Sequence, residues 1–159
     1  MTMAYVAVDR QRARALRDDG RIEGPIAAHA VTPGLLRAHD LGAGDEDAEY
    51  TALAYAGVTA LLTGSDPLRL VLAAELAAPP GGEDGFGRVE LDGLGWTQVT
   101  ALFADESGSA DRVARARTLA TGRDFDQVVD DVRIEALLDD SDLLWFAPTE
   151  LDRLPEPAG

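Results

Sequence analysis

The sequence predicts an α+β fold in which helices cover one β-sheet. Helical patterns alternate along the chain with apolar strand patterns, which is typical of a sheet packed against helices. The longest periodic segment, residues 45–76, has the pattern of a helix, a stop and an apolar strand. The chain has 159 residues, 46% of them hydrophobic, which is enough for one substantial core.

The order of these elements fits a ferredoxin-like α/β sandwich with insertions. The alternative is a three-layer α/β fold with a mostly parallel sheet. We expect a single α+β domain over residues 1–154. A flexible C-terminal tail is expected over residues 155–159, because this proline-containing segment carries no pattern that would pack against a core.

The first segments predict a central strand followed by a helix. Ala4–Asp9 is apolar on both faces, which favours a strand in the middle of the sheet. Arg10–Asp19 has helical spacing and stops at a glycine. Ile26–Val31 predicts a short second strand. Thr32-Pro33 is typical of an N-cap followed by proline in the first helical position, so we expect a short helix over Leu35–Asp40.

Residues 45–76 give the clearest structural prediction. Asp45 is expected to cap a helix over 45–62, whose acidic first turn is favoured by the free N–H groups and the helix dipole. Gly64 and Pro67 predict its end. The apolar run Leu68–Leu76 predicts a strand buried on both faces, and the helix is a candidate for a right-handed crossover from the first strand. The predicted inward face of this helix consists of Tyr50, Leu53, Ala54, Gly57, Val58, Leu61 and Leu62.

The second half of the chain predicts further strands and helices. Extended segments are expected at Arg88–Leu91, Val99–Ala104 and Leu143–Ala147, with a surface loop over 79–85 and a turn over 93–96. Helices are expected from Ser109 or Asp111 to about Ala120, over Asp124–Leu138, and as one turn at Thr149–Leu154.

Charge and composition exclude several kinds of chemistry. The formal net charge is −15, and direct binding of nucleic acid is disfavoured because it needs clustered positive charge. The acidic surface favours solubility, and the sharper interpretation is an electrostatic role, either binding of a basic protein or mimicry of nucleic acid. The chain contains no cysteine and no lysine, which excludes disulfides, thiolate chemistry, a lysine Schiff base and a P-loop lysine.

Location is predicted from the absence of targeting signals. The N-terminus shows no secretory signal pattern, and the apolar runs are shorter than the roughly 20 residues needed to span a bilayer. We therefore expect a cytoplasmic protein without membrane contact.

Two predicted strands end in aspartate, and this gives a candidate anion or metal site. If the strands of Asp9 and Asp105 were parallel neighbours, both carboxylates would meet at the carboxyl edge of the sheet, where open α/β folds bind ligands. Paired carboxylates suit Mg²⁺, and Ser107 and Ser109 precede a helix N-terminus that could accept phosphate. The alternative is that both aspartates are ordinary strand-to-helix turn residues.

The two histidines carry no recognisable site pattern. His29 and His39 lack a familiar metal-ligand spacing, and packed histidines are the commoner outcome. A histidine-dependent hydrolase would need one of four serines, and none of them lies in a Gly-x-Ser-x-Gly motif. These serines are Ser65, Ser107, Ser109 and Ser141.

Several surface residues form a candidate contact surface. Arg10, Arg14 and Arg17 share one side of the first predicted helix and could grip an acidic partner, although pairing with the chain's own carboxylates is the favoured interpretation. Trp96 lies among glycines and could be exposed or could anchor a loop. Trp145-Phe146 is expected in the core.

Five segments together resemble a family of small uncharacterised actinobacterial cytosolic proteins, a domain of unknown function. The segments are Tyr5-Val6, Ala30–Pro33, Glu46–Tyr50, Leu70–Ala74 and Asp142–Trp145. The resemblance implies a bacterial cytosolic protein, and it brings no activity, ligand or site residue with it.

The function expected from these observations is that of a non-enzymatic binding or accessory protein without a cofactor. It would act through contact with an unknown protein partner or through self-association as a homo-oligomer. The alternative is a small Mg-dependent enzyme handling phosphoryl groups or nucleotides with Asp9 and Asp105.

Overall fold

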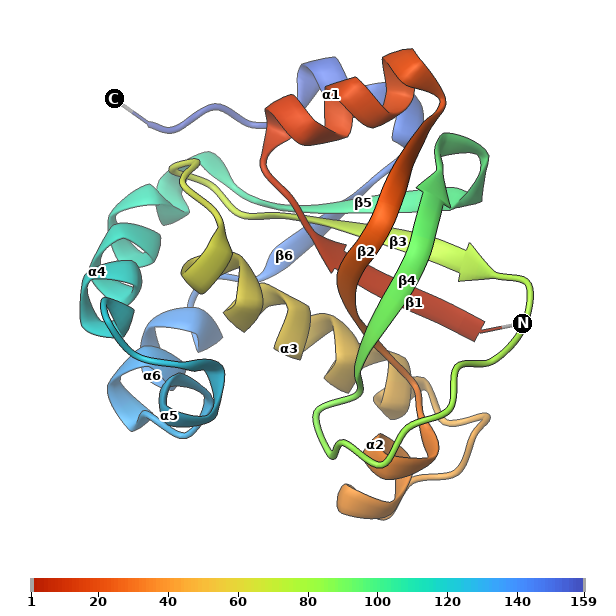
Figure 1. The fold of residues 1–159 in the computed structure, drawn as a ribbon. Helices are drawn as coiled ribbons and strands as arrows, with labels where there is room; N and C mark the ends of the chain where they lie inside the picture. The colour runs from red at the N-terminus through yellow and green to blue at the C-terminus, as the bar shows by residue number, and fades with distance from the viewer. Residues whose placement is uncertain (1, 159) are drawn as a thin grey trace.

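The computed structural model describes residues 2–158 and contains one six-stranded sheet in the order β4-β2-β1-β3-β5-β6 (Figure 1). Every neighbouring pair is antiparallel, so the α+β prediction is confirmed and the mostly parallel alternative is wrong. Gly159, the last residue of the expected tail, lies outside the described residues. The strands are β1 Thr2–Ala7, β2 Arg21–Ala30, β3 Leu70–Leu76, β4 Arg88–Gly95, β5 Val99–Asp105 and β6 Leu143–Phe146.

Helices lie on both faces of the sheet. The helices are α1 Arg10–Asp19, α2 Pro33–Ala38, α3 Glu46–Thr63, α4 Ala110–Ala120, α5 Phe125–Val129 and α6 Val132–Asp139. One face packs against α1 and the 3-10 helix η3 (Pro148–Arg153), and the other face packs against α3. The outer side of α3 forms a third apolar cluster with α4, α5 and α6, which lie beyond it in Figure 1.

Strands β1 and β3 occupy the centre, as their apolar sequences predict. They pair over the whole of β1, from Thr2↔Leu76 to Ala7↔Val71. Because β1 is antiparallel to both of its neighbours, β2 and β3 run in the same direction. The expected crossover from β1 to β3 is therefore wrong, since α2 and α3 connect β2 to β3 across β1.

Strands β2 and β4 are longer than their sequences predict. β2 contains the pair Gly24-Pro25 and β4 contains two glycines, but β2 accommodates its pair in a bulge between Glu23 and Ile26. The predicted turn at 93–96 is also wrong, because β4 continues through Gly95 and the chain turns in the 3-10 helix η1, Trp96–Gln98.

The predicted apolar face of α3 is partly wrong. Tyr50 is 68% exposed, whereas the residues that contact the sheet form a series of small side chains four apart. Small side chains allow the helix axis to approach the strands closely, while Val58 and Leu61 pack on α4 and α6 instead. The series consists of Ala48, Ala52 and Ala56.

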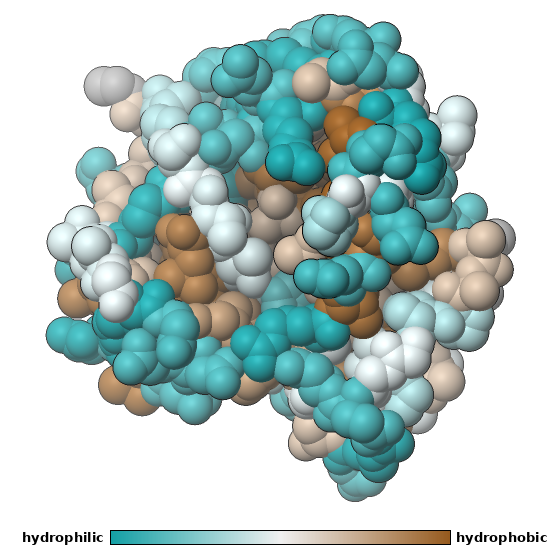
Figure 2. Space-filling view, in the orientation of Figure 1, coloured by the Kyte–Doolittle hydropathy of each residue, from teal (hydrophilic) through white to brown (hydrophobic). Residues whose placement is uncertain are grey.

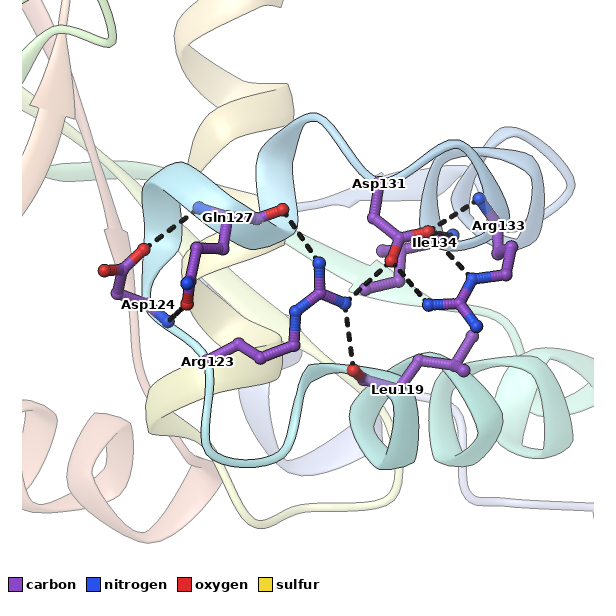
Figure 3. A network of polar contacts seen from close by, with 7 residues as sticks. All are labelled: Leu119, Arg123, Asp124, Gln127, Asp131, Arg133 and Ile134. Atoms are coloured by element: carbon purple, nitrogen blue, oxygen red, sulfur yellow. Dashed lines mark hydrogen bonds and ion pairs between the residues drawn. The ribbon is translucent and has the colours of Figure 1, made fainter.

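The segment 124–138 forms two short helices rather than the single predicted one. Asp131 separates them and caps α6 by accepting hydrogen bonds from the backbone N–H groups of Arg133 and Ile134 at 2.8 and 3.4 Å (Figure 3). The guanidinium groups of Arg133 and Arg123 also bind this carboxylate, and they hold the pKa of Asp131 well below its usual range. Arg123 further donates to the carbonyl groups of Leu119 and Gln127.

The expectation of a buried Trp145 is wrong. The strand β6 lies at the edge of the sheet, where β5 is its only partner among the described strands, and the Trp145 side chain is 61% exposed. Phe146 points to the opposite face and packs against the core cluster of α1 and η3, so the expectation of core packing is met for Phe146 alone of the two residues.

Candidate functional site

A cleft opens where β1 and β2 separate. Their ladder contains only two pairs, Ala4↔Ala30 and Tyr5↔His29, and beyond these the strands diverge. Two adjoining cavities of ≈ 350 and ≈ 390 Å³ lie between the diverging strands and the last turns of α3. Figure 2 shows this face hollowed near its centre, with apolar residues in the depth and hydrophilic residues on the rim. Both cavities are lined by Ala7, Ala27, Thr59 and Thr63.

The two cavities differ in character. The first contains the charged side chains of Asp9, Arg12 and Arg117. The second is more apolar, with Leu62 and Phe125 among its lining residues. An elongated small molecule with one polar and one apolar end would fit this pair of cavities.

His29 and Thr59 form a hydrogen-bonded pair at the wall of the cleft. His29 is 3% exposed, its Nδ1 lies 2.8 Å from the carbonyl oxygen of Phe86, and its Nε2 lies 2.7 Å from Oγ1 of Thr59. Because a carbonyl can only accept, Nδ1 carries the hydrogen, and Nε2 accepts from the threonine hydroxyl. In the neutral imidazole, this arrangement fixes the tautomer and leaves Nε2 as a base.

The surroundings of His29 keep it neutral. Burial lowers its pKa, and the positive charge of Arg88 on β4 acts in the same direction. The Phe86 carbonyl and the Asp84 carboxylate oppose this effect, but the pKa remains below its ordinary value. The rings of Phe125 and Tyr55 complete the enclosure, at centroid distances of 5.2 and 6.1 Å from the imidazole.

Asp105 has a structural partner. The carboxylate is fully buried and accepts three hydrogen bonds from Arg69, from the backbone N–H at 2.7 Å, from Nε at 2.9 Å and from Nη2 at 2.8 Å. Arg69 also donates to the carbonyl groups of Ser141 at 2.8 Å and Gly57 at 3.4 Å. A Cβ at Gly57 would lie 3.0 Å from Nη1 of Arg69, which explains a glycine inside α3.

Asp9 is held in a different place. The strands β1 and β5 run in the same direction, so Asp9, after β1, and Asp105, the last residue of β5, lie at the same edge of the sheet, but β3 lies between the two strands. The Asp9 carboxylate accepts from Ser65 N at 3.1 Å, Ser65 Oγ at 3.0 Å and Asp66 N at 3.2 Å. Asp9 thus stabilises the segment at Ser65 and Asp66, and Asp105 stabilises the start of β3 at Arg69. This arrangement gives no support to the Mg-dependent alternative.

The two serines of the candidate anion site lie in the 3-10 helix η2, Ser107–Ser109. Ser109 is buried and its Oγ accepts from Nη2 of Arg112 at 3.3 Å, while the carbonyl of Ser107 accepts from Ala158 N at 3.0 Å. Within residues 2–158, no group of three or more His, Cys, Asp or Glu side chains could hold a metal ion.

The arginines of the candidate contact surface bind the C-terminal segment of the same chain. Arg10 pairs with Glu156 at 3.1 Å, and Arg14 and Arg17 both pair with Asp152, at 3.4 and 2.7 Å. These contacts fasten α1 to η3 and to the residues after it. Trp96 is half-buried and packs against the core cluster of α1 and η3.

Thr59 is the residue that sequence reasoning missed. Histidine-dependent hydrolase motifs are recognised by a serine, and a separation of 30 positions between His29 and Thr59 matches no recognisable spacing. The contact exists because α3 packs across both β1 and β2, which no local pattern reveals.

The fold and the cleft define a helix-covered antiparallel α+β protein with a small two-part cavity beside a buried histidine. The chain belongs to a family of unknown function, DUF6912, whose sequence model matches residues 2–154. No curated protein and no solved structure matches the chain. None of the helices in residues 2–158 has the length and apolar character that a membrane crossing requires.

The first prediction concerns the buried ion pair. Asp105→Asn should lower the free energy of unfolding by about 3–5 kcal/mol, because it leaves the buried Arg69 without a counter-charge. Urea denaturation measures this loss. Asp152→Asn is the matched control at an exposed pair and should cost less than about 1 kcal/mol. The double variant Arg69→Met/Asp105→Leu should recover most of the stability, and an Asp105→Asn protein as stable as the parent would contradict the role given to the pair.

The second prediction concerns acid stability. The pKa of His29 is lower in the folded chain than its ordinary value of 6.5, so protonation favours the unfolded state. The stabilisation that the neutral imidazole provides is fully present above about pH 6.5 and is lost as the pH falls from there through the lower pKa of the folded chain. We expect His29→Gln to show a smaller loss of unfolding free energy than the parent between about pH 7 and about pH 5, measured in urea.

Proposed function

We propose that this chain is a binding or accessory protein that acts through contact with another protein. The observation that carries the proposal is the exposed edge strand β6, where Trp145 is 61% and Leu144 is 41% exposed. Large apolar side chains on a free strand edge are typical of a surface that pairs with a strand of a partner.

The geometry of β6 supports strand pairing. Its inner edge pairs with β5 through Phe103↔Trp145 and Ala104↔Leu144, and within residues 2–158 no strand pairs with its outer edge. Successive side chains alternate between the two faces of the sheet, so an added strand would meet Trp145 on one face and Leu144 on the other. The main chain would supply affinity and the two apolar side chains would supply specificity.

The charge around β6 favours a basic extended segment of another protein over a second copy. Asp139, Asp140 and Asp142 directly precede the strand, and the chain as a whole has a net charge of −15. Two copies meeting edge to edge would bring two such acidic loops together, whereas lysine or arginine side chains on a partner would be attracted.

The proposed setting is the cytoplasm of an actinobacterium, which is supported by the resemblance of the five quoted segments. Nucleic acid is not among the proposed partners, because phosphate groups would be repelled by the acidic surface.

The third prediction tests the edge. In a Trp96→Phe background, Trp145 is the sole tryptophan, and its fluorescence should shift to shorter wavelength when a peptide of alternating lysine and valine covers it. An alternating lysine and serine peptide of equal charge should cause no shift, because it lacks the apolar side chains. By calorimetry, Trp145→Ser should lose binding and Tyr50→Ser, which removes an exposed aromatic residue from α3, should retain it.

Two outcomes would count against the proposal. The Trp145 fluorescence could shift with the concentration of the chain alone, and sedimentation equilibrium could then show a dimer. In that case the partner at β6 is a second copy of the chain and not a basic segment. Equal binding of both peptides would show that charge alone is responsible and that β6 is not the docking strand.

A further inference from the structure

We propose that the cleft beside α3 is an acyl-transfer site, in which the hydroxyl of Thr59 attacks the carbonyl carbon of a carboxylic ester and His29 accepts its proton. This site is separate from the β6 edge and goes beyond the binding role proposed above.

The first argument is the geometry of the pair. A nucleophilic hydroxyl needs a base within hydrogen-bonding distance, and the base needs a third group that fixes its orientation. Thr59 Oγ1 lies 2.7 Å from Nε2 of His29, and the Phe86 carbonyl holds Nδ1–H at 2.8 Å. Among the described residues, the imidazole therefore presents its free lone pair to the Thr59 hydroxyl and to no other side chain.

The second argument is access. Thr59 lines both cavities and is half-buried, whereas His29 lies almost wholly beneath the surface. A ligand in the cleft meets the hydroxyl, and the histidine acts from behind it. A purely structural histidine could hydrogen-bond any buried group, but this one is bonded to the hydroxyl that both cavities share.

The third argument is a pair of backbone groups that face the gap. The Val8 N–H donates to the Leu70 carbonyl at 3.1 Å, so the backbone N–H and C=O groups of the even-numbered residues of β1 point to β3. The backbone groups of Ala7 therefore point toward β2. On β2 the Ala30 N–H donates to the Gly87 carbonyl at 2.8 Å, so the backbone groups of even-numbered residues point away from β1. The backbone groups of Ala27 therefore point toward β1.

Because the ladder has already ended, the peptide groups of Ala7 and Ala27 border the cleft instead of bonding each other. An N–H group in such a position can stabilise the negative oxygen that forms during acyl transfer. Both residues line the same two cavities as Thr59.

The dimensions and polarity of the cleft define the substrate class. Cavities of ≈ 350 and ≈ 390 Å³ accommodate a small molecule. The apolar cavity near Leu62 and Phe125 suits a short aliphatic acyl group, and the cavity with Asp9 and Arg12 suits a polar alcohol portion. Arg12 has no hydrogen-bond or ion-pair partner in the described part of the chain, so its guanidinium is available to such a group.

The reaction has two balanced halves. Oγ1 of Thr59 forms a bond to the carbonyl carbon while its proton passes to Nε2 of His29, and the carbonyl oxygen takes the negative charge beside Ala7 N–H. The tetrahedral intermediate then expels the alcohol, which takes the proton from Nε2, and an acyl-threonine ester remains. Water attacks this ester, gives a proton to Nε2 and releases the acid, and the threonine oxygen regains that proton.

The fourth prediction tests this assignment with 4-nitrophenyl butyrate. The parent should release 4-nitrophenolate and, in rapidly quenched samples, carry a butyryl group on the peptide containing Thr59. Thr59→Val and His29→Gln should each lower the rate at least about 100-fold. Thr59→Ser should keep both hydrolysis and the adduct. Thr51→Val in the same helix and His39→Gln serve as controls with the parent rate, and circular dichroism with urea denaturation checks that each variant is folded.

Several results would overturn the proposal. No hydrolysis by the folded parent, an unchanged rate in folded Thr59→Val, or an adduct on a histidine instead of Thr59 each excludes a threonine nucleophile. Trp145→Ser should not change the rate, so failure of the binding role at β6 and failure of the acyl-transfer site are distinguishable.

Discussion

The buried pair of Arg69 and Asp105 joins four parts of the chain that are distant in sequence. Removing two charges from water is costly, and here the cost is offset because both oxygens of the carboxylate and most donors of the guanidinium have partners. The pair fixes the start of β3 against the end of β5, and its bonds to Gly57 and Ser141 set the positions of α3 and of the loop before β6. The cleft and the free edge strand both depend on these positions.

Both proposed sites arise from incomplete strand pairing in one antiparallel sheet. Between β1 and β2 the ladder ends after two pairs, and the gap becomes a cavity because α3 covers it. At β6 the sheet ends altogether, and the unpaired edge faces solvent with Trp145 beside it. Both sites contain backbone groups without ladder partners. These groups are enclosed beneath α3 in the cleft and are open to solvent at the edge of β6.

Arginine is mainly a structural residue in this acidic chain. Most of the 14 arginines pair with a carboxylate, and several of these pairs connect separate elements rather than neighbours in sequence. Arg117 serves the same purpose without an acid, because it donates to the carbonyl groups of Ala60 and Leu61 at the end of α3. The arginines of α1 likewise pair with carboxylates of the C-terminal segment.

The sequence alone determined the features that depend on neighbouring residues. The bounds of α1, its left-handed end at Gly20, the cap of α2 at Thr32 and the central place of β3 all follow from short-range hydrogen bonding, backbone sterics and apolar runs. Only the tertiary structure decided strand order and helix placement, because these depend on contacts between segments far apart in the chain. Tyr50 and Trp145 are exposed for this reason, and the same long-range packing brings Thr59 to His29.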